Sequence, residues 1–160
     1  MSPEPEPGPV PAPEPSPGLD LETARRTLKG QPFSRLVGAE LTAFGSGEAV
    51  LEIAVREELR QQNGFLHGGV LAYAADNAIT FAGGSVLGPA VLTGGFTIQY
   101  LRPGTGTRLV ARAQTVHGGR RQAVCRCDLY AVAADGTRTL CAVAQGTVLR
   151  VSAAGEPPSA

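Results

Sequence analysis

The order of predicted elements constrains the fold of this chain more than any other feature. Residues 67 to about 85 carry apolar side chains at three- and four-residue spacing, which predicts one long helix. Two β-like runs precede this helix, and four follow it with no second helix between them. The six runs cover residues 38–44, 48–55, 91–101, 108–116, 122–132 and 139–151. Consecutive strands of this kind are expected to pair antiparallel as a meander, so we predict an α+β fold with one helix against a sheet.

The predicted long helix is rich in small residues, among them Ala74, Ala75 and Ala78. Small side chains let another backbone approach a helix closely. Gly68 and Gly69 lie in its first turn, where each costs about 1 kcal/mol of helix stability relative to alanine. We therefore expect these two glycines to have a role other than stabilising the helix.

One domain is predicted between two solvated ends. Proline occupies every odd position from 3 to 17, so residues 1–18 are predicted to form a disordered, polyproline-like tail. Residues 19–153 are predicted to form the domain, and residues 154–160 a flexible end. Within the domain, residues 19–29 are predicted to form a short helix that Asp20 caps and that Gly30 and Pro32 end.

Charge and composition argue against several classes of protein. The net charge is zero, and without the acidic ends the body has 14 basic and 10 acidic residues, a balance near +4. Because a nucleic-acid footprint needs a denser basic stripe, we expect no nucleic-acid partner. No continuous apolar run approaches the length of a membrane span, and the N-terminus lacks a secretory signal pattern. We therefore expect no membrane partner.

The chain has three cysteines and two histidines. Cys125 and Cys127 are two residues apart, which is not a metal-ligand spacing, so we expect neither a metal site nor a cofactor. We interpret the cysteines as small buried hydrophobic residues in a reducing, cytoplasmic protein.

Residues 61–70, with the sequence Gln-Gln-Asn-Gly-Phe-Leu-His-Gly-Gly-Val, are the densest cluster of unusual residue choices. They place amides, a histidine and two glycines at the start of the long helix. A helix N-terminus offers free backbone N–H groups and partial positive charge, which suits a carbonyl oxygen that becomes negative during a reaction. The alternative is a glycine-rich turn with a histidine that caps the helix.

Asp76 lies nine residues after His67 in an apolar part of the helix. A carboxylate there is unfavourable unless it is exposed or used. In a partly dry site it could act as a general base or a nucleophile. The alternative is a solvent-facing aspartate beside Asn77.

These residues also carry a resemblance to a known family. The run Gly64-Phe65-Leu66-His67-Gly68-Gly69, followed by Asp76, resembles the signature of the hotdog-fold acyl-CoA thioesterases of the phenylacetic-acid-degradation (PaaI-like) family. Two later segments resemble strands of that family, namely Thr93 with Tyr100-Leu101-Arg102-Pro103, and Ala144-Gln145-Gly146. The resemblance spans residues 33–151 and implies a hotdog fold, in which a curved antiparallel sheet wraps around one long central helix.

The resemblance implies a role for each matching catalytic residue. Asp76 would be the catalytic carboxylate, the Gly68 N–H would polarise the thioester carbonyl, and His67 would organise the loop. Thr93 would orient water. Family members usually carry an asparagine six residues before the histidine; here that position is Gln61, while Asn63 lies two residues later, so either amide could face the substrate.

The resemblance also implies a binding set for the acyl-CoA substrate. An arginine in the turn at 117–122 could contact a coenzyme A phosphate, although Arg120, Arg121 and His117 could equally form a solvated turn. Tyr100 is expected to pack against the helix and could line an acyl pocket. The full binding set is Gly69, Gly95, Tyr100, His117, Gly118, Gly119, Arg120, Arg121 and Gln122.

The implied function is hydrolysis of an acyl-CoA, with an aryl-acyl or medium-chain acyl group among the possibilities. The family's sites form between subunits, so a homodimer or homotetramer is expected. Two alternatives stay open. One is a non-catalytic acyl-CoA-binding module, which Asp76 argues against. The other is a hotdog hydratase or dehydratase, which the absence of proline from residues 61–88 argues against.

Overall fold

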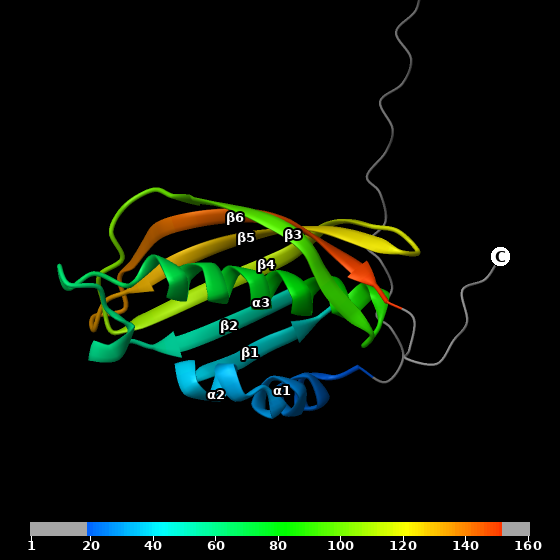
Figure 1. The fold of residues 1–160 in the computed structure, drawn as a ribbon, viewed down its shortest axis with the longest axis horizontal. Coiled ribbons are helices and arrows are strands. Elements are labelled where there is room, and N and C mark those ends of the chain that lie inside the picture. The colour runs from blue at the N-terminus through cyan, green and yellow to red at the C-terminus, as the bar shows by residue number, and fades with distance from the viewer. Residues whose placement is uncertain (1–18, 152–160) are drawn as a thin grey trace, which may run out of the picture.

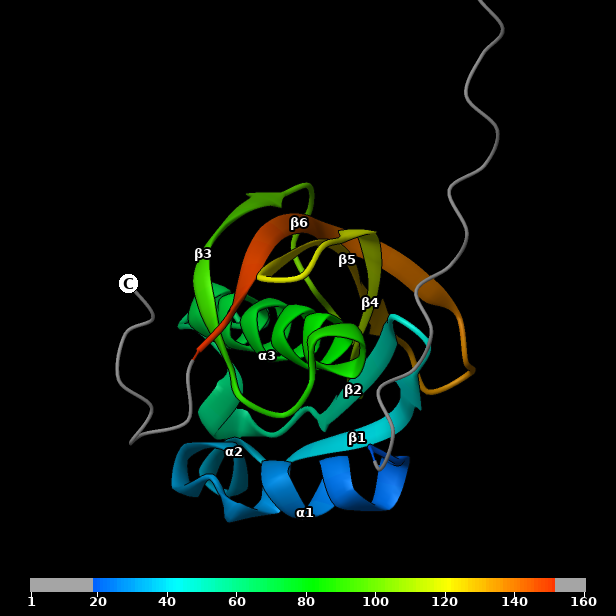
Figure 2. The same cartoon turned by 90° about the vertical axis from the view of Figure 1, so that its right-hand side faces the viewer.

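The computed structural model describes residues 19–151. The predicted tail at 1–18 and the predicted end at 154–160 lie outside these residues. Six antiparallel strands form one sheet that curves around the helix α3 (Figures 1 and 2). The elements are α1 (Leu21–Gly30), α2 (Pro32–Val37), β1 (Ala39–Gly45), β2 (Glu48–Ala54), the 3₁₀ turn η1 (Glu57–Leu59), α3 (Gly68–Leu87), β3 (Val91–Tyr100), β4 (Arg108–Gly118), β5 (Gln122–Val132) and β6 (Arg138–Arg150). The predicted α+β hotdog architecture is confirmed.

The predicted meander is correct for β4, β5 and β6 and wrong for β3. The strand order is β1-β2-β4-β5-β6-β3, so β3 pairs with β6 and not with β4, its neighbour in the chain. Residues 101–107 connect β3 to β4. Seven residues can span about 23 Å, whereas three strand spacings need only about 14 Å, so this link can pass the ends of β6 and β5. As a result β1 and β3 form the two edges of the sheet.

The N-terminal helices differ from the prediction at Pro32. Asp20 caps α1 as predicted, because its carboxylate accepts a hydrogen bond of 2.8 Å from the Thr23 N–H. The predicted helix ends before Pro32, at Gly30, as expected, but Pro32 also begins α2, which was not predicted. Proline is favoured at a first helical position, where its missing N–H would have no intrahelical acceptor. Gly38 ends α2 in the left-handed conformation, with φ at 78°.

Small residues bring α3 into close contact with the sheet. Ala74, Ala75, Ala78 and Ala82 are fully buried. A Cβ atom at Gly83 would lie 2.7 Å from Val148 on β6, so this glycine is required by space rather than by its backbone conformation. By length and composition α3 could cross a membrane, but most of it is buried inside the sheet, as expected of a core helix.

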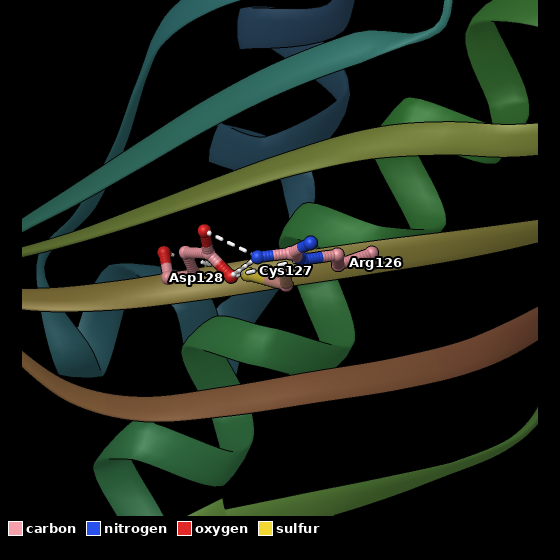
Figure 3. A network of polar contacts seen from close by, with 3 residues as sticks. All are labelled: Arg126, Cys127 and Asp128. Atoms are coloured by element: carbon pink, nitrogen blue, oxygen red, sulfur yellow. Dashed lines mark hydrogen bonds and ion pairs between the residues drawn. The ribbon is translucent and has the colours of Figure 1, made fainter.

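Strand β5 separates apolar from charged side chains by alternation. Cys125 and Cys127 face the core and, like Cys141, are buried free thiols, which confirms the interpretation of the cysteines as buried residues. Burial raises the pKa of the Cys127 thiol to about 12. Arg126 and Asp128 point to the outer face, where a guanidinium nitrogen lies 3.1 Å from the carboxylate (Figure 3).

Replacing Gly83 by alanine tests the close packing of α3. We expect Gly83→Ala to lower the free energy of unfolding by about 1–3 kcal/mol, because the new methyl overlaps Val148. Gly30→Ala is the matched control, since no atom lies within 4 Å of a Cβ there. Urea unfolding at equal chain concentration measures both. Equal stability of Gly83→Ala and the wild type would contradict the packing argument.

Candidate active site

Asp76 is held by two threonine hydroxyls from different elements. The Thr93 hydroxyl on β3 donates a hydrogen bond of 2.6 Å to the Asp76 carboxylate. The Thr80 hydroxyl oxygen lies 2.6 Å from that of Thr93, and Thr80 also donates to the Asp76 carbonyl at 2.8 Å. Thr93 was predicted as a site residue from the sequence, whereas Thr80 was not. The sequence did indicate Thr80, because it follows Asp76 by four residues and residues four apart lie on one face of a helix.

Asp76 faces a cavity rather than open solvent. Its side chain is half-buried, and together with Thr80 and Thr93 it lines a cavity of about 280 Å³. The residues that line the cavity come from α1, β1, α3 and β3. Figure 2 shows that β1 and β3, the two edge strands of the sheet, do not meet. The alternative of a simple solvent-facing aspartate is therefore disfavoured.

The start of α3 leaves one backbone donor available. His67 caps the helix, and its Nδ1 accepts a hydrogen bond of 2.9 Å from the Gly69 N–H, as the alternative of a capping histidine required. The Gly68 N–H donates no hydrogen bond within residues 19–151. The Tyr100 hydroxyl donates to the Gly68 carbonyl at 3.0 Å, so Tyr100 lies against this turn, although it is more than half exposed. Gly68 can therefore offer its N–H to a carbonyl oxygen.

The two candidate amides differ in their environments. The Gln61 side-chain oxygen accepts a hydrogen bond of 3.0 Å from the Asn63 N–H. The Gly64 N–H closes the same turn on the Gln61 carbonyl at 2.9 Å, with φ of Gly64 at 81°. The Asn63 residue is exposed. Each amide thus keeps a nitrogen that could donate, and Gln61 is the better ordered of the two.

One chain does not bring Gly68 and Asp76 together. They are eight residues apart on one helix, a rise of about 12 Å. A single thioester carbonyl cannot contact both groups over that distance. The contacts within one chain therefore assemble Asp76, Thr80 and Thr93, and leave the Gly68 donor at a separate place.

The predicted binding residues lie in three regions. The turn between β4 and β5 contains the predicted set at 117–122, which is exposed throughout. It lies near the C-terminal end of α3, since the Arg121 carbonyl accepts from the Arg150 N–H and the Arg150 side chain binds the Leu87 carbonyl (Figure 1). Gly95 follows a bulge on β3, and no atom lies within 4 Å of the place that a Cβ would take there. Gly69 lies in the first turn of α3, and its N–H donates to the His67 Nδ1.

Comparisons with known proteins agree with this arrangement. A family model described as the thioesterase superfamily matches residues 63–148. The acyl-coenzyme A thioesterase PaaI of Escherichia coli is 33% identical over 92 residues, which cover 57% of this chain and 65% of that protein, slightly less than two thirds.

Two solved structures extend the similarity beyond the segment matched by the family model. A thioesterase family protein from Silicibacter pomeroyi has a TM-score of 0.75 at 30% identity, covering 80% of this chain and 95% of the other. The E. coli PaaI structure has a TM-score of 0.71 at 26% identity, covering 82% and 92%.

The pKa of Tyr73 provides a test of the site's electrostatics. Burial raises the pKa of the Tyr73 phenol, its hydrogen bond with Ser34 lowers it, and the Asp76 charge raises it. We expect Asp76→Asn to lower the Tyr73 pKa, because a neutral neighbour no longer disfavours the phenolate. Asp128→Asn on the outer face should leave it unchanged. An NMR titration of labelled tyrosine rings measures both, and an unmoved pKa in Asp76→Asn would contradict the placement of this charge.

Proposed function

The chain belongs to the thioesterase superfamily, a family of thioester hydrolases, and we propose that it hydrolyses an acyl-CoA to the free acid and coenzyme A in a site shared by two subunits. The observation that carries this proposal is the Asp76 carboxylate, which faces a cavity and is oriented by Thr93. A hydrolase needs such a carboxylate, whereas a module that only binds acyl-CoA does not. The cytoplasmic location stays a prediction.

The proposed chemistry uses Asp76 to activate water. As a general base, Asp76 accepts a proton while the water oxygen attacks the thioester carbon, and Thr93 holds the carboxylate in place. The tetrahedral intermediate then breaks its C–S bond, and the departing thiolate takes the proton. Alternatively, Asp76 attacks the carbon itself and water hydrolyses the resulting anhydride. Both routes need Asp76 charged and beside the carbonyl.

The Gly68 N–H would stabilise the oxyanion. It is a free donor at the positive end of a 20-residue helix, the environment that favours developing negative charge. Removing one such donor typically raises the barrier by about 2.7–4 kcal/mol. The free amide nitrogen of Gln61 or Asn63 would be a second donor.

A homodimer would join the two halves of the site. Strand β3 is a ten-residue edge with exposed Leu92 and Tyr100, which is unfavourable unless another strand covers it. Antiparallel pairing of two β3 strands about a twofold axis also sets the two α3 helices antiparallel. The Gly68 end of one helix then lies toward the Asp76 of the other subunit. A homotetramer of two such dimers stays open.

We assign the turn at 117–122 to coenzyme A. Arg120 and Arg121 are exposed and follow Gly118 and Gly119, so a phosphate could reach a guanidinium without a bulky neighbouring side chain in the way. The β4–β5 turn lies away from the Gly68 end of its own chain, as a long nucleotide bound across an interface would require.

Replacing Asp76 tests the catalytic assignment. We expect Asp76→Asn to reduce kcat by about 100-fold or more, because the shape is kept and the charge is lost. Asp128→Asn is the control, since that carboxylate lies on the outer face. Release of free thiol from a panel of acyl-CoAs measures both variants. A fully active Asp76→Asn enzyme would exclude Asp76 as base or nucleophile.

Gly68→Pro removes the proposed oxyanion donor alone. Proline is tolerated at a first helical position, and the preceding His67 has φ −65° and ψ 134°, the extended conformation that a residue before proline adopts. We expect kcat to fall by about 100- to 1,000-fold. Gly68→Ala keeps the N–H and meets only ordinary contacts with Tyr100, so it should be far less affected. Equal losses in the two variants would mean that the N–H is not the relevant group.

Mixing the two inactive proteins tests the shared site. If Asp76 and Gly68 act across the interface, a heterodimer of Asp76→Asn and Gly68→Pro chains has one intact site. Random exchange makes half of the dimers mixed, so about a quarter of wild-type activity should return. If both residues acted in one chain, every site would carry a defect and no activity would return. Mass spectrometry of the mixture confirms that exchange has occurred.

A further inference from the structure

One end of the domain carries three arginines that no carboxylate of the described chain neutralises. Arg120 and Arg121 are exposed in the β4–β5 turn, and the Arg150 N–H donates to the Arg121 carbonyl at 2.8 Å. The Arg150 guanidinium binds the Leu87 carbonyl at the end of α3. Within residues 19–151, no ion pair joins any of the three arginines to a carboxylate. This end of the domain can therefore accept negative charge from elsewhere.

The active-site cavity extends to the same end of the domain. Leu19, the first residue that the structure describes, lines it together with Gly88, which follows α3. A Cβ at Gly88 would lie 3.9 Å from the Arg150 guanidinium. Figure 1 shows the start of α1 and the ends of α3 and β6 on the same side of the molecule. Residues 1–18 are therefore attached at the cavity wall, close to the three arginines.

The attached segment has the opposite charge to this end of the domain. Residues 1–18 contain Glu4, Glu6 and Glu14 and no basic side chain. Glu14 precedes Leu19 by five residues, a reach of up to about 17 Å, and the other two glutamates have more than twice that reach. Because the segment is tethered, its effective concentration at the arginines is on the order of millimolar. Weak charge pairs are enough to hold it there part of the time.

The composition of the segment also suits the apolar side chains near the arginines. Eight of residues 1–18 are proline. Proline-rich peptides bind apolar surfaces with little loss of conformational entropy, because their extended form exists before binding. Leu149 and Val151 flank Arg150 in the sequence and are 40% and 36% exposed. This surface thus offers both of the contacts that an acidic, proline-rich segment can use.

We propose that residues 1–18 bind back onto this end of the domain and inhibit it. The glutamates pair with the three arginines, and the prolines cover the two apolar side chains beside the cavity. Coenzyme A is assigned to the same turn, so the segment and the substrate exclude each other there. The inhibition rests on the proposed acyl-CoA hydrolysis, whereas the contact itself does not. The family model begins at residue 63, so the segment lies outside the part of the chain shared with the family.

A spin label in the segment tests the contact without any substrate. The three native cysteines are buried, so a label on Ala12→Cys attaches selectively. In the full chain we expect the label to remove the amide NMR signals of Arg120 and Arg121. The amide of Leu59, which lies near the start of α3, should keep its signal. Replacing the three glutamates of the segment by glutamine, or adding about 1 M salt, where the Debye length is about 3 Å, should restore the lost signals.

Steady-state kinetics test the inhibition. The variant with glutamine at the three glutamates of the segment is compared with a control that carries glutamine at Glu40, Glu48 and Glu57, which are exposed elsewhere. Both variants change the net charge equally, so the control measures the effect of charge alone on an anionic substrate. We expect KM for acyl-CoA in the segment variant to be about threefold or more below that of the control, with kcat unchanged. An acyl thioester of N-acetylcysteamine, which lacks the nucleotide, should show no difference.

The outcomes separate the contact, its effect and the proposed function. Signals that the label removes and glutamine restores, together with the lowered KM, support the inference. Unchanged signals of Arg120 and Arg121 in the labelled chain overturn it, whether or not acyl-CoA is hydrolysed. Equal KM values in the segment variant and the control overturn the inhibition. If no acyl-CoA is cleaved, hydrolysis and its inhibition are overturned together, and the label still decides the contact.

Discussion

The close approach of α3 to the inner face of the sheet is the constraint on which the rest of the structure depends. Alanines and Gly83 let the helix lie so near β6 that a methyl at position 83 would overlap Val148. One curved sheet can enclose a helix held at this distance, and no second helix is needed to cover the inner face of the sheet. The same packing fixes the rotation of α3, which turns Asp76 and Thr80 toward Thr93 on β3 and Phe81 toward Phe44 on β1.

The position of Asp76 follows from that enclosure. The sheet closes around α3 from β1 to β3 but leaves its edges apart, and the cavity occupies this opening. Hydrogen-bond donors stabilise a carboxylate in such a half-buried place. Thr93 supplies one from the edge strand, and the Thr80 hydroxyl oxygen on the helix lies 2.6 Å from that of Thr93. Strand β3, which carries Thr93, is also the edge proposed to pair with a second subunit. Asp76 would then lie next to the start of the partner's α3.

Local patterns in the sequence predicted the elements better than their arrangement. The long helix, the strands and the cap at Asp20 depend on neighbouring residues, and they form as predicted. The pairing of β3 with β6 depends on whether residues 101–107 turn back or cross the sheet, which spacing alone does not determine. The helix α2 was missed because proline, which follows the end of α1 as predicted, also begins helices. Of the candidate site, Asp76 and Thr93 were each predicted, and the structure places them in contact. Thr80 was missed because its part in the site shows only in its contact with Thr93, which comes from another element.

The groups around the cavity come from two parts of the chain. The groups proposed to act on the thioester, Gly68, Asp76 and Thr93, all lie in the segment that matches the family model. Gln31 and Ser34 come from the N-terminal helices, outside that segment. Tyr73 connects the two parts, since it lies one helical turn before Asn77 and donates its hydroxyl to Ser34. A change in α1 or α2 can therefore alter the shape of the cavity without moving the carboxylate, because α3 is held mainly by its contacts with the sheet.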